Sequence, residues 1–178
     1  MPRIAQIDLD HALAKARELV DEYAARAGAP GPMVRTMATA PAVLRGYLDL
    51  NRAMKRSHLD RRITERIALA AQEWIGCAYC VAAHTAAAQK LGLNDRDIEL
   101  AKQGTATDPA IASIVAFGQQ VIAAPAEISD ADVERLRSHG YSDEQIAEVV
   151  GIVSLMLLTG AFNLVAGIEP SNTARSAA

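Results

Sequence analysis

The chain has 178 residues, of which 18 are basic and 21 acidic, giving a formal net charge of −3. This balance leaves no basic stripe, so we expect no nucleic-acid partner. Apolar residue types make up 51% of the sequence and aromatic residues only 4%. Much of the apolar share is alanine, the best helix former. Length and composition therefore predict a single all-α domain over residues 1–178.

The first half of the chain is predicted to form four helices bounded by glycine, proline or capping residues. They are expected over residues 9–27, 41–54, 61–74 and 77–92. Gly28 ends the first helix, and a loop rich in proline and glycine follows. Pro41 opens the second helix, Asp60 caps the third, and Gly76 separates the third from the fourth.

The second half is predicted to form four more helices, for about eight in all with short connections. They are expected to begin near residues 94, 109, 129 and 142. Asp108 and Pro109 form a cap followed by proline at the first helical position. The pairs Ser129 with Asp132, and Ser142 with Gln145, resemble capping boxes.

The segment Val149–Ile168 carries no charge over 20 residues, which is long enough to span a bilayer. However, it continues a capped amphipathic helix and has no flank rich in lysine or arginine. We therefore predict a buried central helix and no membrane association. A helix apolar on all sides needs neighbours on all sides, so we expect some of them to come from another subunit of a homo-oligomer. The N-terminus shows no secretory signal pattern, which predicts a cytoplasmic protein.

Cys77 and Cys80 are the two cysteines of the sequence. Their spacing is too short for a structural loop-closing disulfide, and in a reducing compartment such a pair favours redox chemistry or metal binding. If both lie in the first turn of a helix with His84 one turn further on, all three side chains share one stripe. The helix dipole then favours a thiolate at Cys77, and His84 can exchange a proton with Cys80.

Glu65 lies twelve residues before Cys77, on the preceding predicted helix. An antiparallel turn at Gly76 would bring this carboxylate beside the cysteines, where it could serve as a general base. The alternative is an ordinary glutamate on a solvated helix face.

Two other interpretations of the cysteine pair remain open. The cysteines could be small buried residues without chemistry, or half of a zinc site with His84 as third ligand. His11, His58 and His139 are candidates for a fourth ligand, but none has supporting spacing. The sequence also contains no phosphate-cradling glycine loop beside a strand, so no cofactor is predicted.

A larger motif surrounds these residues, consisting of a glutamate, a glycine and the sequence Cys-x-Tyr-Cys-x-x-Ala-His-Thr. Its members are Glu65, Gly76, Cys77, Tyr79, Cys80, Ala83, His84 and Thr85. This motif resembles the carboxymuconolactone decarboxylase superfamily, and within it the AhpD-like alkylhydroperoxidases. The motif core spans residues 60–92, and the resemblance extends over about 34–170. Asn163 falls where members of that family often carry asparagine.

The resemblance implies an AhpD-like helical bundle assembled as a dimer, trimer or hexamer. It implies thiol-dependent reduction of hydroperoxides without a metal or flavin, with a thiol or lipoyl-bearing protein as reductant. In the implied roles, Cys80 attacks the peroxide, Cys77 resolves the sulfenic acid, and Glu65 with His84 forms a proton relay. The resemblance and the helix dipole disagree on the more reactive cysteine, because the dipole favours Cys77.

Well-described peroxidase members carry a histidine at the position of Tyr79. A phenol is a poor proton carrier near neutral pH because its ordinary pKa is about 10. Two alternative functions also stay open. The first is lactone decarboxylation, against which the presence of both cysteines argues. The second is a non-catalytic redox sensor whose disulfide state alters packing.

Overall fold

The computed structural model describes residues 2–9 and 12–169, and every regular element in this part of the chain is helical. The all-α prediction is therefore confirmed. The helices are α1 (Ala14–Ala27), α2 (Pro32–Met37), α3 (Pro41–Met54), α4 (Arg61–Ile75), α5 (Ala78–Lys90), α6 (Asp95–Lys102), α7 (Pro109–Ala123), α8 (Asp130–Ser138) and α9 (Asp143–Ala166), with a 3₁₀ turn at Pro125–Glu127.

The helix boundaries follow the local signals in most places. The Asp60 side chain accepts a hydrogen bond from the Arg62 amide at 2.7 Å and so caps α4. The predicted capping boxes that open α8 and α9 are both formed. Gly76 ends α4 with a φ of +80°, in the left-handed region that favours glycine.

Two predictions near the N-terminus were wrong. The first helix begins at Ala14, later than the expected residue 9, and residues 10 and 11 lie outside the described part of the chain. Where we expected a loop, Pro32 opens the short helix α2. Proline suits this first helical position because its missing N–H would have no partner there. The short α2 raises the number of described α-helices above the predicted eight.

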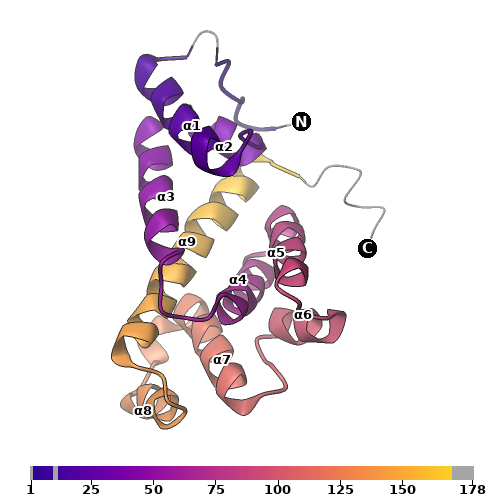
Figure 1. Ribbon diagram of the computed structural model, residues 1–178, viewed down its shortest axis with the longest axis vertical. Coiled ribbons are helices and arrows are strands. Elements are labelled where there is room, and N and C mark those ends of the chain that lie inside the picture. The colour runs from indigo at the N-terminus through magenta and orange to yellow at the C-terminus, as the bar shows by residue number, and fades with distance from the viewer. Residues whose placement is uncertain (1, 10–11, 170–178) are drawn as a thin grey trace.

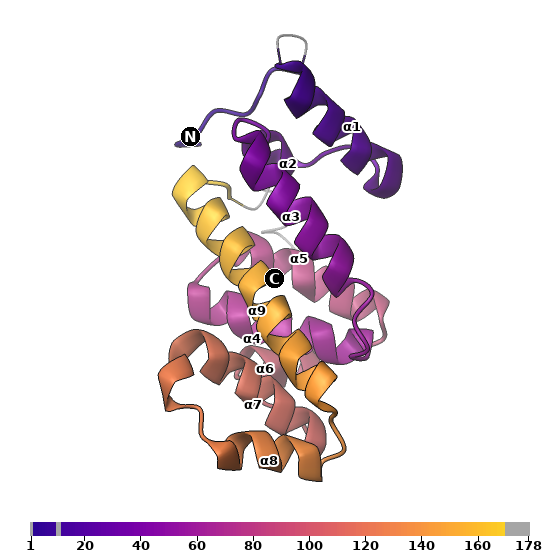
Figure 2. The same cartoon turned by 90° about the vertical axis from the view of Figure 1, so that its left-hand side faces the viewer.

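Helix α4 lies at the centre of the bundle and packs against α5, α6, α7 and α9. Residues 65–72 of α4 are all buried, which fits a helix with neighbours on every side. Figures 1 and 2 show α9 running diagonally through the molecule, from α8 at one end to α1–α3 at the other. The crossing of α4, α5 and α9 is where the motif residues meet.

Helix α9 has the length and hydropathy to cross a bilayer, yet half of its most apolar window is buried inside the bundle. This matches a core helix as well as a membrane span. The single chain does not enclose α9 on all sides. Leu157 is 49% exposed, and Val150, Leu164 and Val165 are exposed as well.

Candidate active site around Cys77 and Cys80

The cysteine pair lies directly after the turn at Gly76. We had expected Cys77 in the first turn of this helix, but it is the N-cap residue of α5. Cys80 lies inside the helix. The two residues form a disulfide with their Cα atoms 5.3 Å apart, so the structure represents the oxidised protein. Both are nearly inaccessible to solvent, with exposed fractions of 1% and 3%.

The first sulfur has the position of a capping group. Cys77 Sγ accepts a hydrogen bond from the Cys80 backbone amide at 3.3 Å. Amides of a helix N-terminus stabilise a negative charge through their dipoles. The same arrangement favours a thiolate at Cys77 in the reduced protein, even though the residue lies just outside the helix.

Glu65 and His84 form the second part of the site. The turn at Gly76 folds α5 back along α4, and Glu65 Oε2 lies 2.7 Å from His84 Nδ1. The Glu65 carboxylate is buried, and its other oxygen lies 3.6 Å from an Arg61 guanidinium nitrogen. The predicted approach of Glu65 to the motif is thus seen in the structure. Among the described residues, His84 makes no hydrogen bond to either sulfur.

Asn163 contributes a contact that the sequence did not predict. Its side-chain Nδ2 donates a hydrogen bond to Cys80 Sγ at 3.2 Å, across 83 residues of sequence. Asn163 is 1% exposed, and its Oδ1 has no hydrogen-bond partner in the described structure. A buried asparagine in an apolar helix requires a polar partner. The sequence placed Asn163 only at a position where the resembling family often carries asparagine, and it did not identify this partner.

A second polar contact fixes how α9 crosses α4. Gln72 Nε2 donates to the Met156 carbonyl at 3.1 Å and lies 3.2 Å from Thr159 Oγ1. Gly160 allows this close approach, because a Cβ at that position would lie 2.5 Å from Gln72 Oε1. The crossing holds the next turn of α9, which carries Asn163, against the start of α5.

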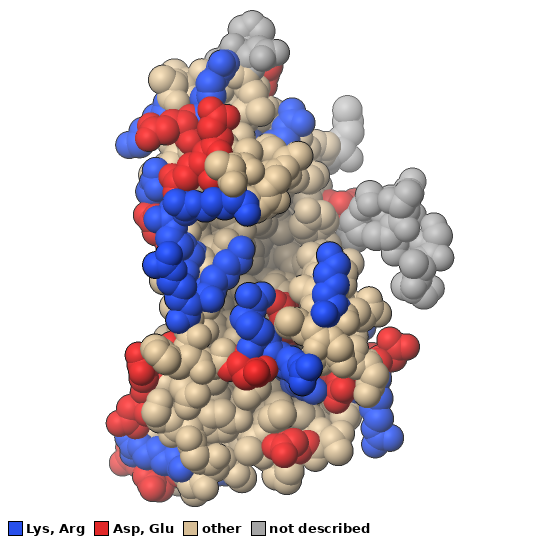
Figure 3. All heavy atoms as spheres, viewed as in Figure 1, with Lys and Arg blue, Asp and Glu red and all other residues tan. Residues whose placement is uncertain are grey.

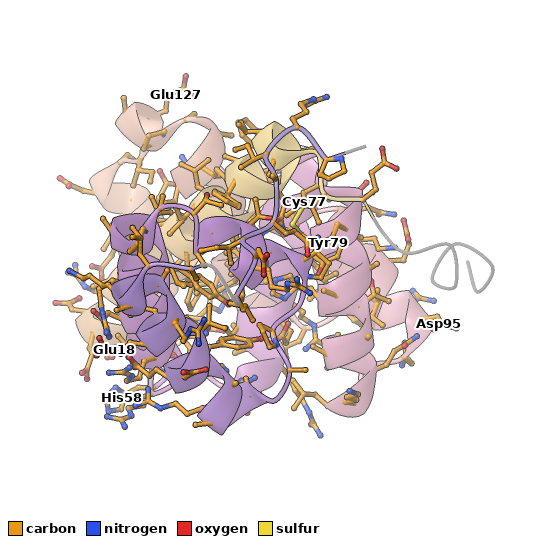
Figure 4. The ribbon with its side chains drawn as sticks, turned by 90° about the horizontal axis from the view of Figure 1, so that it is seen from above. Glu18, His58, Cys77, Tyr79, Asp95 and Glu127 are labelled. Atoms are coloured by element: carbon orange, nitrogen blue, oxygen red, sulfur yellow. A yellow bond between two sulfur atoms is a disulfide. The ribbon has the colours of Figure 1, made fainter. Side chains whose placement is uncertain are left out.

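Tyr79 lies beside the cysteines, as Figure 4 shows for Cys77 and Tyr79. Its hydroxyl would be 3.8 Å from a Cβ built at Gly31, where α2 begins. Burial raises the pKa of the Tyr79 phenol above its ordinary value of 10.0. A phenol that holds its proton more tightly is less suited to proton transfer near neutral pH.

Among the described residues, neither His58 nor His139 joins the cysteines in a set of potential zinc ligands. His58 lies far from Cys77 in Figure 4, with its Nδ1 3.1 Å from Glu148 Oε1. His139 is the C-cap residue of α8, and His11 lies outside the described residues. His58, Glu144 and Glu148 form a separate group of potential metal ligands at the surface.

The site therefore combines two sulfurs, a carboxylate–imidazole pair and one buried amide donor on three crossing helices. These groups can form and break a disulfide and move protons beside it. They define an all-helical thiol–disulfide protein with a CxxC pair. Residues 41–119, which hold every site residue except Asn163, match the sequence model of the carboxymuconolactone decarboxylase family. This match confirms the resemblance of the motif to that family.

Three similar proteins extend the comparison. The uncharacterized protein YdfG of Bacillus subtilis is 25% identical over 119 residues, which cover 65% of this chain and 80% of YdfG. The AhpD-core, peroxidase-related protein of Ralstonia eutropha superposes with a TM-score of 0.84 at 24% identity, covering 97% of this chain and 94% of its own. The debrominase Bmp8 superposes with a TM-score of 0.78 at 17% identity, covering 98% and 95%. The structural likenesses establish the AhpD-core fold, and a fold alone does not determine the reaction.

Proposed function

We propose that this protein is a thiol-dependent hydroperoxide reductase whose Cys77–Cys80 pair is oxidised and re-reduced in each catalytic cycle. One observation carries the proposal. The disulfide lies at the start of α5, and one turn further along the same helix His84 is held by the buried Glu65 carboxylate at 2.7 Å. A redox-active pair next to an oriented acid–base group is what peroxide reduction by thiols requires.

The proposed reaction starts from the reduced protein. The Cys80 thiolate attacks the terminal oxygen of the hydroperoxide, and the O–O bond breaks. The alcohol leaves after taking a proton from His84, and Cys80 becomes a sulfenic acid. The Cys77 thiol then attacks the Cys80 sulfur and forms the disulfide, and its proton passes to the leaving hydroxide, which departs as water. The peroxide has gained two electrons, and the two cysteines have lost them.

An external dithiol closes the cycle. It attacks the Cys77–Cys80 disulfide, passes through a mixed disulfide and leaves as a disulfide itself, returning two electrons and two protons to the cysteines. A lipoyl-bearing protein or another thiol protein fits this role. The assignment of Cys80 as the attacking sulfur is supported by Asn163, whose amide donates to Cys80 Sγ and can stabilise its thiolate.

The test is steady-state consumption of cumene hydroperoxide with dihydrolipoamide as reductant. We expect turnover by the wild-type protein and none by Cys80→Ser. In the absence of the dithiol, we expect Cys77→Ser to reduce about one equivalent of peroxide and then stop, because the sulfenic acid at Cys80 then has no thiol to resolve it. Full turnover by the Cys80→Ser variant would contradict the proposal.

The role of the carboxylate is tested with a matched pair of variants on α4. Glu65→Gln removes the charge that holds His84 and should lower kcat about 100-fold, a typical contribution of acid–base catalysis. Glu73→Gln makes the same chemical change at an exposed position of α4 and should leave kcat unchanged. Equal rates for the two variants would exclude the proton relay.

A second candidate function is a redox sensor, and the burial of both sulfurs favours it. A nearly inaccessible disulfide forms and breaks slowly, and it is tied to α9 through Asn163. This candidate predicts a change in assembly size between oxidised and reduced protein without peroxide turnover. Identical size-exclusion profiles in oxidant and in dithiothreitol would exclude it.

A further inference from the structure

A pocket of about 160 Å³ opens between α3, α4 and α9 and reaches His84. One wall is apolar and consists of Met54, Ile152, Leu155 and Met156. Glu65 and His84 also line the pocket, so it reaches the acid–base pair of the proposed site. The pocket is smaller than the roughly 300–1,000 Å³ of sites for drug-sized ligands, which points to a compact ligand.

Two cations flank the pocket at the connection between α3 and α4. Lys55 is the C-cap residue of α3, and Arg61 is the first residue of α4. Both are exposed, and Figure 3 shows basic side chains around a hollow between α3 and α5 on this face.

The cations outnumber the acidic groups available to them. Glu65 is the carboxylate that lines the pocket, and it already holds His84 at 2.7 Å and Arg61 at 3.6 Å. Lys55 makes no ion pair with any described residue. The nearby Asp60 carboxylate is engaged by the Arg62 amide as the cap of α4. The pocket therefore combines an apolar wall with an uncompensated positive charge, and an anion with an apolar body complements both.

We propose that this pocket binds the substrate and that the substrate is a compact hydroperoxide carrying a carboxylate. The inference rests on the proposed peroxidase function and specifies its substrate class. The carboxylate pairs with Lys55 and Arg61, the apolar body lies against Met54, Ile152 and Leu155, and the hydroperoxide is directed toward His84. Cys80 lies one helical turn from His84 on the same helix, α5.

Binding is tested first, with ligands that cannot react. We would titrate the oxidised protein with 4-isopropylbenzoate and with 4-isopropylbenzyl alcohol and measure Kd by calorimetry. The benzoate should bind about tenfold more tightly than the alcohol, the effect of one hydrogen bond to a charged group. Lys55→Met and Arg61→Met should each weaken benzoate binding about tenfold. Equal Kd values for the two ligands, or unchanged benzoate binding in Lys55→Met, would overturn the inference.

The matched controls are cations outside the pocket lining. Arg56 follows Lys55 directly in the sequence, and Lys90 is the last residue of α5. Arg56→Met and Lys90→Met remove the same charge from the protein and should leave the Kd of the benzoate unchanged. A uniform loss of affinity in all four variants would show that only the overall charge matters, and it would overturn the assignment of the pocket.

Catalysis provides the second test. Cumene hydroperoxide and its 4-carboxy derivative differ by one carboxylate, and the carboxy derivative should have the lower KM. Lys55→Met should reduce the ratio of the two KM values about tenfold. Selective benzoate binding without peroxide turnover would refute the proposed function while supporting the pocket. Turnover with equal KM values for the two peroxides would refute the pocket inference alone.

Discussion

At the scale of single residues, the site depends on three polar side chains from three helices. Glu65 comes from α4, His84 from α5 and Asn163 from α9, and each is fixed by a contact within the site. Asn163 is the residue whose role is least explained by packing, because one of its polar atoms contacts sulfur and the other has no partner in the described structure. Burying an amide in this position costs free energy unless the amide forms a hydrogen bond, here to the Cys80 sulfur.

We predict that Asn163 increases the reactivity of the reduced Cys80 thiol. A hydrogen bond donated to a thiolate favours the charged form and lowers the pKa of the thiol. In a Cys77→Ser background, Asn163→Leu should therefore slow alkylation of Cys80 by iodoacetamide about tenfold at pH 7 and shift its pH profile upward. Thermal unfolding of the same variants serves as the control for folding, and an unchanged pH profile would refute the prediction.

Four of the site residues could be predicted from sequence, and the reason is their local spacing. Cys77, Cys80 and His84 are placed by one helix, and Glu65 follows from a single antiparallel turn at Gly76. The Asn163 contact depends on how α9 crosses α4, which is fixed by the Gln72 contacts and the absence of a side chain at Gly160. Local sequence signals do not determine how these two helices cross. The role of each cysteine stays a prediction.

At the scale of elements, the turn between α4 and α5 positions the cysteines. Gly76 adopts a φ of +80°, and a Cβ at this position would meet no atom within 4 Å. A side chain at this position would therefore destabilise the protein only through backbone strain at positive φ, and not through a steric clash. Most other helix ends were predictable for the same reason, since caps and left-handed glycines are local features. The start of α1 and the helix α2 were not, because no distinct N-cap marks either one.

We predict opposite effects for the same substitution at two glycines. Gly76→Ala should destabilise the protein by about 1 kcal/mol, because alanine is strained in the left-handed region. Gly46→Ala lies within α3, where φ is ordinary and space is open, and should stabilise the protein by about 0.5–1 kcal/mol. Urea unfolding of both variants measures the difference. A stabilising Gly76→Ala would contradict this account of the turn.

The capping box that opens α8 should contribute to stability in a pH-dependent way. Hydrogen bonds from the Ser129 hydroxyl and amide, with a smaller contribution from Arg135, lower the pKa of Asp132 to about 2. Because the folded pKa is below the unfolded value of about 3.9, the stabilisation is complete above about pH 4 and is lost as the pH falls toward 2. Asp132→Asn should reduce the loss of stability between pH 4 and pH 2. A carboxyl resonance of Asp132 titrating near pH 4 would contradict this expectation.

At the scale of the whole molecule, one side of α9 is apolar and exposed, because the single chain does not cover it. Val43, Leu157, Leu158, Phe162 and Val165 line a shallow apolar groove there. Large exposed apolar surfaces are typical of contacts between proteins. The sequence predicted that α9 would need neighbours beyond its own chain, and the homo-oligomer that would supply them stays a prediction.

We expect this side of α9 to contact a second copy of the chain, as the predicted homo-oligomer requires. Leu157→Lys should then reduce the molar mass measured by size exclusion with light scattering, because a buried lysine without a partner is costly. Ala126→Lys adds the same charge at an exposed position of the 3₁₀ turn and should leave the mass unchanged. A monomeric wild-type protein would refute the expectation.

The position of the disulfide within one short stretch also makes its state directly readable in cells. Arg66 and Lys90 are the nearest trypsin cleavage sites, so Cys77 and Cys80 fall on a single tryptic peptide over residues 67–90. Oxidation changes the mass of this peptide by two hydrogen atoms and links it to no other fragment. After rapid thiol blocking, mass spectrometry of one peptide therefore reports the fraction of oxidised protein during peroxide stress, without a tag, an antibody or a reconstituted partner.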